Sequence, residues 1–244
     1  MALPFFYIGY LDASSTIITL NEETSKHVVQ VLRMKEGEEL NLTDGKGNLL
    51  TAEITNAHKR NCAVRVKVTS FKPQAAKKVS IAISLVKNAS RFEWFLEKAT
   101  EIGVTEIIPL LCERTERQHF RYDRMNGILV SAMLQSQQTW LPLLHEPTKL
   151  DDYIRQTGAS DGAYKFIAHC IDEGGQSLSK ILSGVEGQIK SSSNRTILIG
   201  PEGDFTPNEI ELALQHQFIP VILGETRLRT ETAGVAAAVL LCIQ

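Results

Sequence analysis

Short apolar runs that alternate with helical segments fill residues 79–244, and this rhythm constrains the fold more than any other feature of the chain. The run VSIAISLV at 79–86 is apolar almost throughout, which is typical of a strand buried on both faces of a sheet. The segment 91–103 is expected to be a helix that ends at Gly103. Further strands are expected at 106–111, 164–169, 196–200 and 220–224, and further helices near 121–138, 177–183, 207–217 and 231–243. The alternation predicts an α/β domain with a mostly parallel sheet.

Residues 5–70 have a different pattern, in which apolar and polar residues alternate around tight turns. The segment 39–54 alternates on both sides of an Asp-Gly turn, and 62–68 alternates again. Short strands joined by such turns predict a small β-barrel or sandwich. The segment 70–78 contains a proline and three lysines and breaks the pattern, so we place a domain boundary there. The predicted domains are residues 1–73 and 74–244.

Cysteine spacing and hydropathy exclude several classes of protein. The four cysteines are far apart and form no Cys-x-x-Cys pair, so neither a zinc site nor a disulfide framework is predicted. The longest apolar run, at 233–243, is shorter than the roughly 20 residues that a membrane-spanning helix needs. The start of the chain lacks the basic segment of a signal peptide. We therefore expect a cytoplasmic protein, in a reducing compartment, with no metal site and no membrane partner.

The stretch ILIGPEGDFTPNEIE at 197–211 carries the first candidate site. It reads as a strand, a glycine-containing turn at 200–203 and the start of a helix. Thr206 and Glu209 have the spacing of a capping box, with a proline at the first helical position. A loop between a strand and a helix N-terminus commonly binds phosphate. This stretch, however, has neither a P-loop nor a dinucleotide-binding glycine pattern, and its two carboxylates would repel a phosphate.

A second glycine-containing turn follows the last expected strand. The stretch LGETRLRTETAG at 223–234 begins where that strand ends and leads into a helix rich in alanine and glycine. Ligands of open α/β sheets bind outside the carboxyl ends of the strands, so the turns at Gly200 and Gly224 are both candidates for a ligand site. The small residues of the last helix let backbones approach closely, so we expect this helix to pack tightly inside the domain.

Three stretches of the second domain carry a family resemblance. The pair IGPEGDFTPNEI and LGETRLRTETAGVAAAV resembles the ribosomal RNA small subunit methyltransferase E family of the SPOUT superfamily. The stretch RFEWFLEKATEIGVTEIIPL, with Lys98, Thr100, Glu101 and Gly103, matches a third motif of that family. The N-terminal β domain matches only in kind, because family members carry a PUA-like RNA-binding barrel there.

This resemblance implies an S-adenosylmethionine-dependent enzyme that methylates N3 of a uridine in 16S rRNA. It also implies a homodimer and a C-terminal trefoil knot, a topology that general folding rules would have rejected. The expected partners are 16S rRNA, free or assembled in the small ribosomal subunit, and a second copy of the chain. The cationic sulfonium of this cofactor and its lack of phosphate suit a turn that carries carboxylates. The expected cofactor-binding residues are Leu198, Ile199, Gly200, Pro201, Glu202, Gly203, Leu223, Gly224, Leu228, Thr230, Glu231, Thr232 and Ala233.

Methylation of the uridine requires alignment of the reacting atoms and removal of one proton from N3. Positioning supplies the larger share of the rate, and a general base contributes about 10²- to 10⁴-fold. We expect Arg229 to stabilise the uridine anion through charge-assisted hydrogen bonds to its carbonyl oxygens. His169 is the alternative catalytic residue, although a histidine at a strand end is more often structural. Thr230 and Thr232 have an alternative role as helix caps, and Glu231 as a partner of the helix dipole.

Basic residues of both domains are candidates for RNA binding. They are Arg33, Lys59, Arg60, Lys87, Arg91, Lys98, Arg114, Arg117 and Arg121. Arg114, Arg117 and Arg121 recur with Arg124 at spacings of three, four and three, which places them on one helical face if that segment is helical. The alternative is a solvated face that pairs with neighbouring carboxylates, and basic residues on strands of the β domain can equally protect a sheet edge.

One stretch departs from the family pattern, and two competing hypotheses stay open. Leu134 and Gln138 occupy positions that are charged in many family members, so RNA contacts or the dimer surface are expected to differ there. The first alternative is a catalytically silent RNA-binding protein, against which the intact glycine turns and Arg229 argue. The second is a SPOUT enzyme that acts on another RNA or another base atom.

Overall fold

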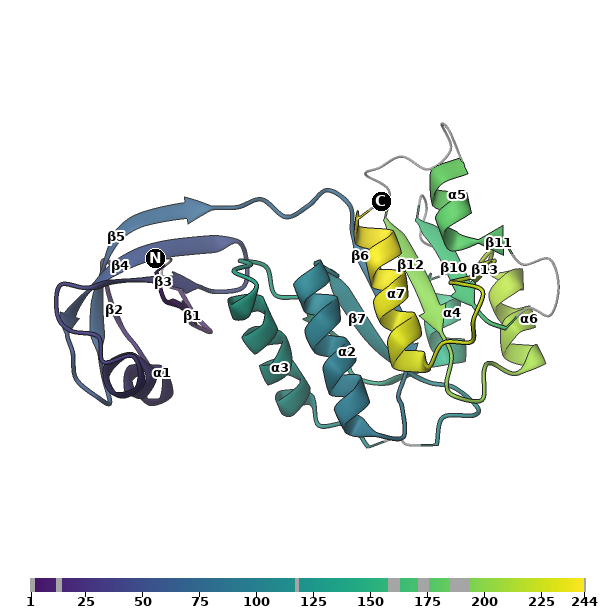
Figure 1. Ribbon diagram of the computed structural model, residues 1–244, viewed down its shortest axis with the longest axis horizontal. Helices are drawn as coiled ribbons and strands as arrows, with labels where there is room; N and C mark the ends of the chain where they lie inside the picture. The colour runs from purple at the N-terminus through teal and green to yellow at the C-terminus, as the bar shows by residue number, and fades with distance from the viewer. Residues whose placement is uncertain are drawn as a thin grey trace. The chain divides into compact units, whose positions relative to one another are not determined.

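The computed structural model describes residues 3–11, 15–116, 119–157, 163–170, 176–184 and 194–243, and the chain forms two compact units (Figure 1). The first unit comprises Met1–Gln74 and Met133–Leu141, and the second comprises Ala75–Ala132 and Pro142–Gln244. The first unit therefore includes a segment that is remote from it in sequence. No helix of the described residues is long and apolar enough to span a lipid bilayer.

The first unit is a small curled sheet with one helical segment (Figure 1). Its elements are β1 (Phe5–Tyr7), β2 (Ile17–Thr19), α1 (Glu22–Lys26), the π-helix η1 (His27–Val31), β3 (Glu39–Thr43), β4 (Asn48–Asn56) and β5 (Ala63–Phe71). Among the described residues the strand order is β1-β3-β4-β5-β2, with β1 parallel to β3 and the other pairs antiparallel. Alternate side chains such as Leu40, Leu42 and Ile54 fill the interior. The predicted small β domain is confirmed.

The segment Met133–Leu141 joins the first unit through Trp140. The indole N–H of Trp140 donates to the carbonyl oxygen of Lys72 at 2.8 Å, and its ring packs edge-on against Phe71. Gly47 lies beside it in the left-handed region, with φ of 94°. A Cβ at Gly47 would lie 2.7 Å from both the Trp140 ring and the Lys72 carbonyl oxygen. This turn therefore requires glycine for its conformation and for its space.

The second unit is an α/β fold on a parallel sheet, as the alternation of strands and helices predicts. Its elements are β6 (Val79–Ser84), α2 (Ala89–Ile102), β7 (Glu106–Leu111), α3 (Tyr122–Gln135), β8 (Leu143–Leu144), β9 (Thr148–Lys149), α4 (Leu150–Thr157), β10 (Tyr164–Ala168), β11 (Gln176–Ser177), α5 (Leu178–Gly184), β12 (Arg195–Ile199), α6 (Pro207–Gln215), β13 (Ile219–Ile222) and α7 (Thr230–Ile243). Among the described residues the strand order is β11-β13-β10-β12-β6-β7-β8, with β9 also beside β7. Every pairing among these strands is parallel. The predicted fold class, a mostly parallel α/β domain with a small N-terminal PUA-like β domain, is confirmed.

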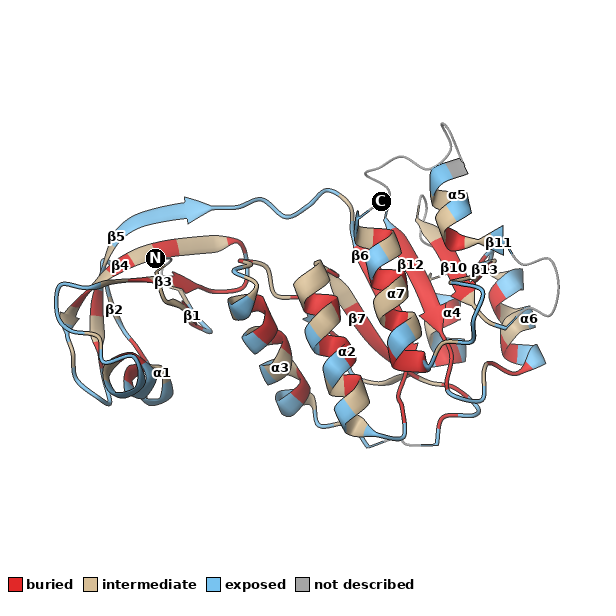
Figure 2. Cartoon of the chain, in the orientation of Figure 1, coloured by how far each residue is buried: buried red, intermediate tan, exposed pale blue. Residues whose placement is uncertain are grey.

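Helices cover both faces of this sheet. All residues of β6 and β12 are buried (Figure 2), as expected for central strands of a parallel sheet. Ile83 lies against α7, as a Cβ added at Gly234 of α7 would lie 2.7 Å from the Cδ1 atom of Ile83. The preceding residue, Ala82, belongs instead to a core cluster with Leu150 of α4 and Ala213 of α6. Successive side chains of a strand point to opposite faces, so α7 and the pair α4 and α6 lie on opposite sides of the sheet.

The last helix packs tightly, as its small residues predict. α7 contacts α2, β6 and β12. Its Gly234 is buried, and an added Cβ would lie 2.7 Å from the ring of Phe95, which is fully buried on α2. Glycine at this position therefore permits the close approach of α7 to α2 and to the sheet.

Most predicted elements lie within two residues of their expected positions, and the differences have local causes. α2 begins at Ala89, earlier than expected, because the side chain of Asn88 accepts a hydrogen bond from the N–H of Ser90 at 3.0 Å and caps the helix. α3 ends at Gln135, three residues early, and Gln137 then adopts a left-handed φ of 55°. α4 was not predicted, because this short helix buries only Leu150 and Ile154 within a polar sequence.

Candidate functional site

A pocket of about 410 Å³ lies at the carboxyl ends of β10, β12 and β13. These strands are neighbours in the sheet, with β10 between β12 and β13. Residues 168–170 line the pocket at the end of β10, residues 199–202 and Asp204 line it at the end of β12, and residues 221–230 line it from the end of β13 to the start of α7. This edge of an open α/β sheet is where ligands normally bind.

The structure brings most of the expected site residues to this pocket. Those that line it are His169, Ile199, Gly200, Pro201, Glu202, Leu223, Gly224, Leu228, Arg229, Thr230 and Ala233. Four expected cofactor residues lie outside the lining, namely Leu198, Gly203, Glu231 and Thr232. Leu198 is fully buried in the core cluster below the pocket, whereas Thr232 is exposed on the first turn of α7.

Local hydrogen bonds fix the turn between β12 and α6. The predicted capping box is present: the N–H of Thr206 donates to the carboxylate of Glu209 at 2.7 Å, and the N–H of Glu209 donates back to the Thr206 hydroxyl at 3.4 Å. The hydroxyl of Thr230 donates to the carbonyl oxygen of Gly200 at 3.0 Å. This bond ties the start of α7 to the first glycine turn, so the two sides of the pocket are held together before any ligand binds.

Gly200 also approaches the aromatic ring below it closely. A Cβ at this position would lie 3.1 Å from the ring of Phe205, which is only 3% exposed. Gly224, by contrast, has no atom of the described residues within 4 Å of an added Cβ. A side chain at the first glycine would therefore crowd the Phe205 ring, whereas the second glycine faces open space at the pocket.

Glu202 lines the pocket and is held by the segment that precedes α2. Its carboxylate accepts a hydrogen bond from the backbone N–H of Lys87 at 3.4 Å, and its carbonyl oxygen accepts one from Arg227 at 3.4 Å. The side chain of Lys87 pairs with Glu116 at 2.8 Å, and this hydrogen bond raises the pKa of Lys87. Glu202, an expected cofactor residue, therefore lies at the pocket with one carboxylate oxygen bonded to the backbone beside α2.

Asp204 is a site residue that the sequence reasoning treated only as a charge. Its backbone is left-handed, with φ of 64°. One carboxylate oxygen accepts the N–H of Cys170 at 2.9 Å, and the other accepts the N–H of Phe205 at 2.8 Å. Asp204 therefore joins the end of β10 to the turn after β12. The available signal was its residue type, because Asp tolerates the left-handed region better than most residues.

Glu231 is buried, although it lies outside the pocket lining. Its Oε1 is 3.6 Å from Nε of Arg91 on α2. Its Oε2 is buried and has no hydrogen-bond partner among the described residues. The sequence assigned Glu231 to the cofactor and Arg91 to RNA, and the structure places the two side chains together where α7 begins beside α2.

The two candidate catalytic residues differ in their surroundings. Arg229 is exposed at the pocket, and no residue of the described chain forms a hydrogen bond or ion pair with its guanidinium. His169 is partly buried, and its Nδ1 lies 3.3 Å from the carbonyl oxygen of Cys170. The guanidinium of Arg229 is therefore available to a ligand, whereas one ring nitrogen of His169 is within hydrogen-bond distance of the backbone.

The predicted arginine stripe on one helical face is wrong. Arg114 lies in a turn after β7, and its guanidinium donates to the carbonyl oxygen of Gly203 at 2.6 Å. Arg121 precedes α3, which begins at Tyr122. Arg117 lies outside the described residues. Because the helix begins only after these positions, the regular spacing does not bring the arginines onto one face.

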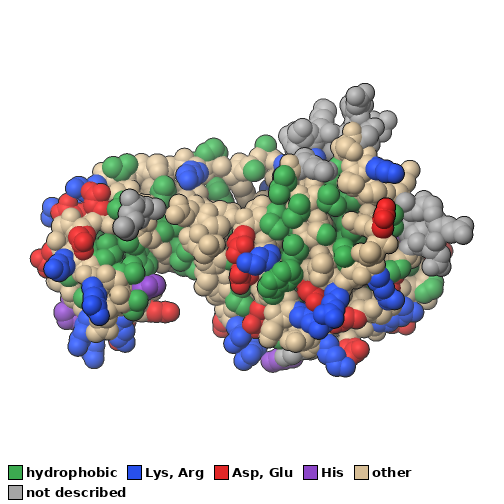
Figure 3. All heavy atoms as spheres, in the orientation of Figure 1, with side chains coloured by type: hydrophobic (Ala, Val, Ile, Leu, Met, Phe, Trp, Pro, Cys, Tyr) green, Lys and Arg blue, Asp and Glu red, His purple; other side chains and the backbone are tan. Residues whose placement is uncertain are grey.

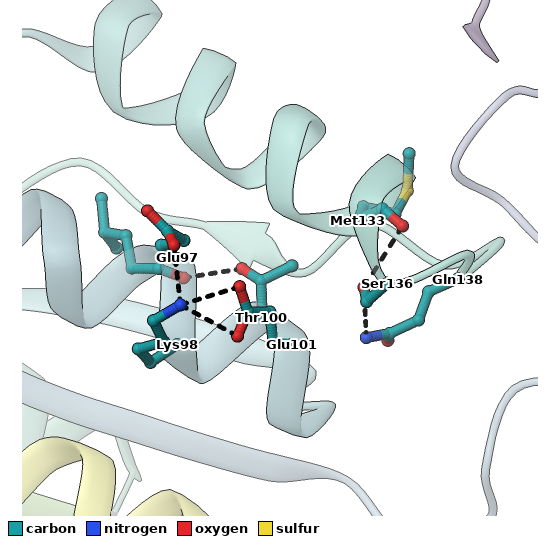
Figure 4. A network of polar contacts seen from close by, with 8 residues as sticks. Glu97, Lys98, Thr100, Glu101, Met133, Ser136 and Gln138 are labelled. Atoms are coloured by element: carbon teal, nitrogen blue, oxygen red, sulfur yellow. Dashed lines mark hydrogen bonds and ion pairs between the residues drawn. The ribbon is translucent and has the colours of Figure 1, made fainter. Parts of the chain in front are cut away.

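Other candidate RNA-binding residues carry acidic neighbours. Lys98 pairs with Glu97 at 2.7 Å and with Glu101 at 3.0 Å (Figure 4), and the hydrogen bond to Glu97 raises its pKa. Arg60 lies 4.0 Å from Glu22. These pairs match the alternative of a solvated, charge-paired surface.

Two further candidates lie in the first unit. Arg33 follows the π-helix in a left-handed conformation, with φ of 55°. Lys59 is exposed between β4 and β5.

At the departure from the family pattern, the amide of Gln138 donates to the hydroxyl of Ser136 at 2.9 Å (Figure 4), while Leu134 is partly buried near the end of α3.

No cluster of three or more histidine, cysteine, aspartate or glutamate side chains within the described chain is arranged to hold a metal ion.

Models of two protein families match different parts of the chain. Residues 73–242 match the model of the RNA methyltransferase domain family, and residues 20–67 match that of the RNA methyltransferase PUA domain. A ribosomal RNA small subunit methyltransferase E from Synechocystis is 30% identical, over 90% of this chain and 71% of that protein.

Two solved structures are similar over nearly the whole chain. The crystal structure of a probable rRNA-methyltransferase from Porphyromonas gingivalis is 35% identical, with a TM-score of 0.86, over 99% of this chain and 100% of that one. The crystal structure of a ribosomal RNA small subunit methyltransferase E from Neisseria gonorrhoeae bound to S-adenosyl methionine is 26% identical, with a TM-score of 0.82, over 97% and 95%. The chain therefore belongs to the ribosomal RNA small subunit methyltransferase E family of RNA methyltransferases.

Proposed function

We propose that this protein transfers a methyl group from S-adenosylmethionine to N3 of a uridine in 16S rRNA of the small ribosomal subunit. The observation that carries the proposal is the pocket between the two glycine turns, whose sides are joined by the bond from Thr230 to the Gly200 carbonyl. A relative with the same fold was solved with S-adenosyl methionine bound. The position on the base and the choice of RNA follow from the family resemblance in the sequence.

The residues of the pocket fit this cofactor. Its volume is within the usual range for small-molecule sites. We propose that the adenosine and methionine parts contact the N–H groups of the turn at 200–202 and the backbone groups of 222–224, which line the pocket. Glu202 and Asp204 supply carboxylates in the lining, which suit a ligand with a cationic sulfonium and oppose a phosphate. We propose that Gly200, Leu223 and Leu228 form the principal contacts.

The bound cofactor supplies a methyl group on a positively charged sulfur, and the uracil N3 must lose its proton. We assign Arg229 the role of holding the carbonyl oxygens of the uridine, because its guanidinium has no partner among the described residues and lies at the pocket. Negative charge that develops on the base as the proton leaves is then stabilised by a fixed cation. His169, which also lines the pocket, is the candidate residue to accept the proton from N3.

Capture of the RNA is proposed for the PUA-like first unit together with basic residues near the pocket. Arg33 and Lys59 belong to the first unit, and Lys87 and Arg114 flank the turn that contains Glu202. The ion pair of Lys87 with Glu116 is exposed, so it costs little to exchange the carboxylate for an RNA phosphate.

We also propose a homodimer, a trefoil-knotted second unit and a cytoplasmic location. Exposed apolar side chains support an interface on α2 and α7: Trp94 is 43% exposed and Ile243 is 71% exposed. Hydrophobic side chains gather over these two helices (Figure 3). Exposed apolar patches of this kind often mark protein interfaces. The location follows from the proposed substrate, because ribosomal RNA is assembled in the bacterial cytoplasm.

A methyl-transfer assay tests the proposal. Purified protein is incubated with radiolabelled S-adenosylmethionine and, separately, intact small subunits, naked 16S rRNA or tRNA, and the modified nucleoside is identified by mass spectrometry. N3-methyluridine formed in 16S rRNA, free or in subunits, supports the proposal. Transfer to tRNA or to another base atom supports a different specificity on the same fold, and RNA binding without transfer supports the catalytically silent alternative.

A further inference from the structure

Asp204 lies in the left-handed region, which most side chains disfavour and which aspartate tolerates better than most. Among the described residues, four non-glycine residues have positive φ, and Asp204 is the one of these that lines the pocket. Glycine would adopt φ of 64° without steric strain, whereas a side chain here disfavours the conformation. A strained residue at a ligand site points to a function of its side chain.

The carboxylate of Asp204 is held in a fixed orientation. The N–H groups of Cys170 and Phe205 each donate to a different carboxylate oxygen, at 2.9 and 2.8 Å. Its own N–H donates to the carbonyl oxygen of Pro201 at 2.9 Å. A carboxylate oxygen has more than one lone pair, so these bonds orient the group and leave each oxygen further acceptor capacity.

The negative charge of Asp204 is also unpaired. No lysine, arginine or histidine of the described chain lies within ion-pair distance of it. Glu202, the other carboxylate of the same turn, instead directs an oxygen to the backbone N–H of Lys87. Asp204 is therefore the fixed, uncompensated negative charge of this side of the pocket.

We propose that Asp204 is a specificity-determining residue that makes the pocket prefer the sulfonium form of its ligand to the thioether form. This inference rests on the proposed function. S-adenosylmethionine and S-adenosylhomocysteine differ by one methyl group and one positive charge at sulfur, so a fixed negative charge in the lining attracts the first more strongly. Opposite unit charges in a partly exposed site attract by an amount equivalent to roughly a tenfold change in affinity. S-adenosylhomocysteine, the product, is neutral at sulfur and lacks this attraction, so it is held less tightly than the methyl donor.

A purely structural role for Asp204 makes a different prediction. If its carboxylate only joins the end of β10 to the turn after β12, its loss loosens the pocket for both ligands, and both affinities fall by the same factor. The ratio of the two dissociation constants therefore separates the two roles, whereas either affinity alone does not.

The test is calorimetric titration of the full-length protein with S-adenosylmethionine and, separately, S-adenosylhomocysteine. Asp204→Asn removes the charge with little change of shape, and Asp204→Gly removes the side chain while relieving the left-handed strain. Glu211→Gln is the matched control, because Glu211 is exposed on α6, outside the pocket lining, and its loss changes the net charge equally. Circular dichroism establishes that each variant is folded.

We expect both Asp204 variants to reduce the preference for S-adenosylmethionine by roughly tenfold, and Glu211→Gln to keep the wild-type preference. An unchanged ratio in both Asp204 variants would overturn the inference, as would folded variants that bind neither ligand, since Asp204 would then only build the pocket. Failure of the wild-type protein to bind either ligand would contradict the proposed function itself, which is a distinct result.

Discussion

Replacement of Gly234 by alanine tests the close packing of α7, on which the shape of the pocket depends. In an exposed helix interior, glycine to alanine stabilises by about 0.5–1 kcal/mol, because alanine has the higher helix propensity. At Gly234, however, the added Cβ would lie 2.7 Å from Ile83 and from the ring of Phe95, both fully buried. Inserting a methyl group into a filled core costs about 1–3 kcal/mol. From the middle of the two ranges, Gly234→Ala is expected to destabilise the second unit by about 1 kcal/mol.

Gly127→Ala is the matched control for this substitution. Gly127 is an exposed residue within α3, and no atom of the described chain lies within 4 Å of an added Cβ. This variant is expected to be stabilised by about 0.5–1 kcal/mol. Thermal unfolding followed by circular dichroism gives both values, with roughly 2–4 °C per kcal/mol for a unit of this size. A Gly234→Ala variant as stable as the wild type, or stabilised like the control, would contradict the close packing of α7.

Three further substitutions or measurements have defined expected results. Arg229→Ala is expected to keep the affinity for S-adenosylmethionine and to lower methyl transfer by at least about 10²-fold, and wild-type turnover would exclude its catalytic role. Two hydrogen bonds from Arg124, at 2.6 and 2.9 Å, lower the pKa of Glu93 from its usual 4.5, so this pair contributes stability above about pH 4.5 that is lost as the pH falls through the lowered pKa. Glu93→Gln should therefore destabilise by less than about 1 kcal/mol at pH 7, with an effect that diminishes as the pH falls through the lowered pKa of Glu93, and a pH-independent effect would contradict this. Burial raises the pKa of Cys112 to about 12, so a thiol reagent should label the exposed Cys170 well before Cys112, and equal labelling rates in folded protein would contradict the burial.

Local signals predicted much of the fold, and long-range contacts account for what they missed. The apolar run at 79–86 predicted a buried central strand, because a strand that is covered on both faces of a parallel sheet is apolar at almost every position. Thr206 and Glu209 predicted the start of α6, because a capping box involves only residues three apart. α4 has no such signal: its sequence is polar, and it is stabilised by packing against α6 and the sheet.

The same distinction applies to the site. The two glycine turns were identified as candidate ligand sites from their own sequences, and both line the pocket. The part played by Asp204 was missed because its partner, Cys170, is remote in sequence and is brought near by the pairing of β10 with β12. The predicted arginine stripe was wrong because spacings of three and four place residues on one face only within a helix. The helix α3 begins only at Tyr122.

The central claim, that the pocket between the glycine turns binds the methyl donor, is tested most directly by calorimetric titration of Gly224→Phe with S-adenosylmethionine beside the wild type. Gly224 lines the pocket, and an added Cβ there meets no described atom, so the larger side chain is expected to occupy the pocket without disturbing the fold. We expect saturable binding by the wild type and loss of binding in the folded variant. Equal affinity of the two proteins would contradict the claim that the cofactor binds in this pocket.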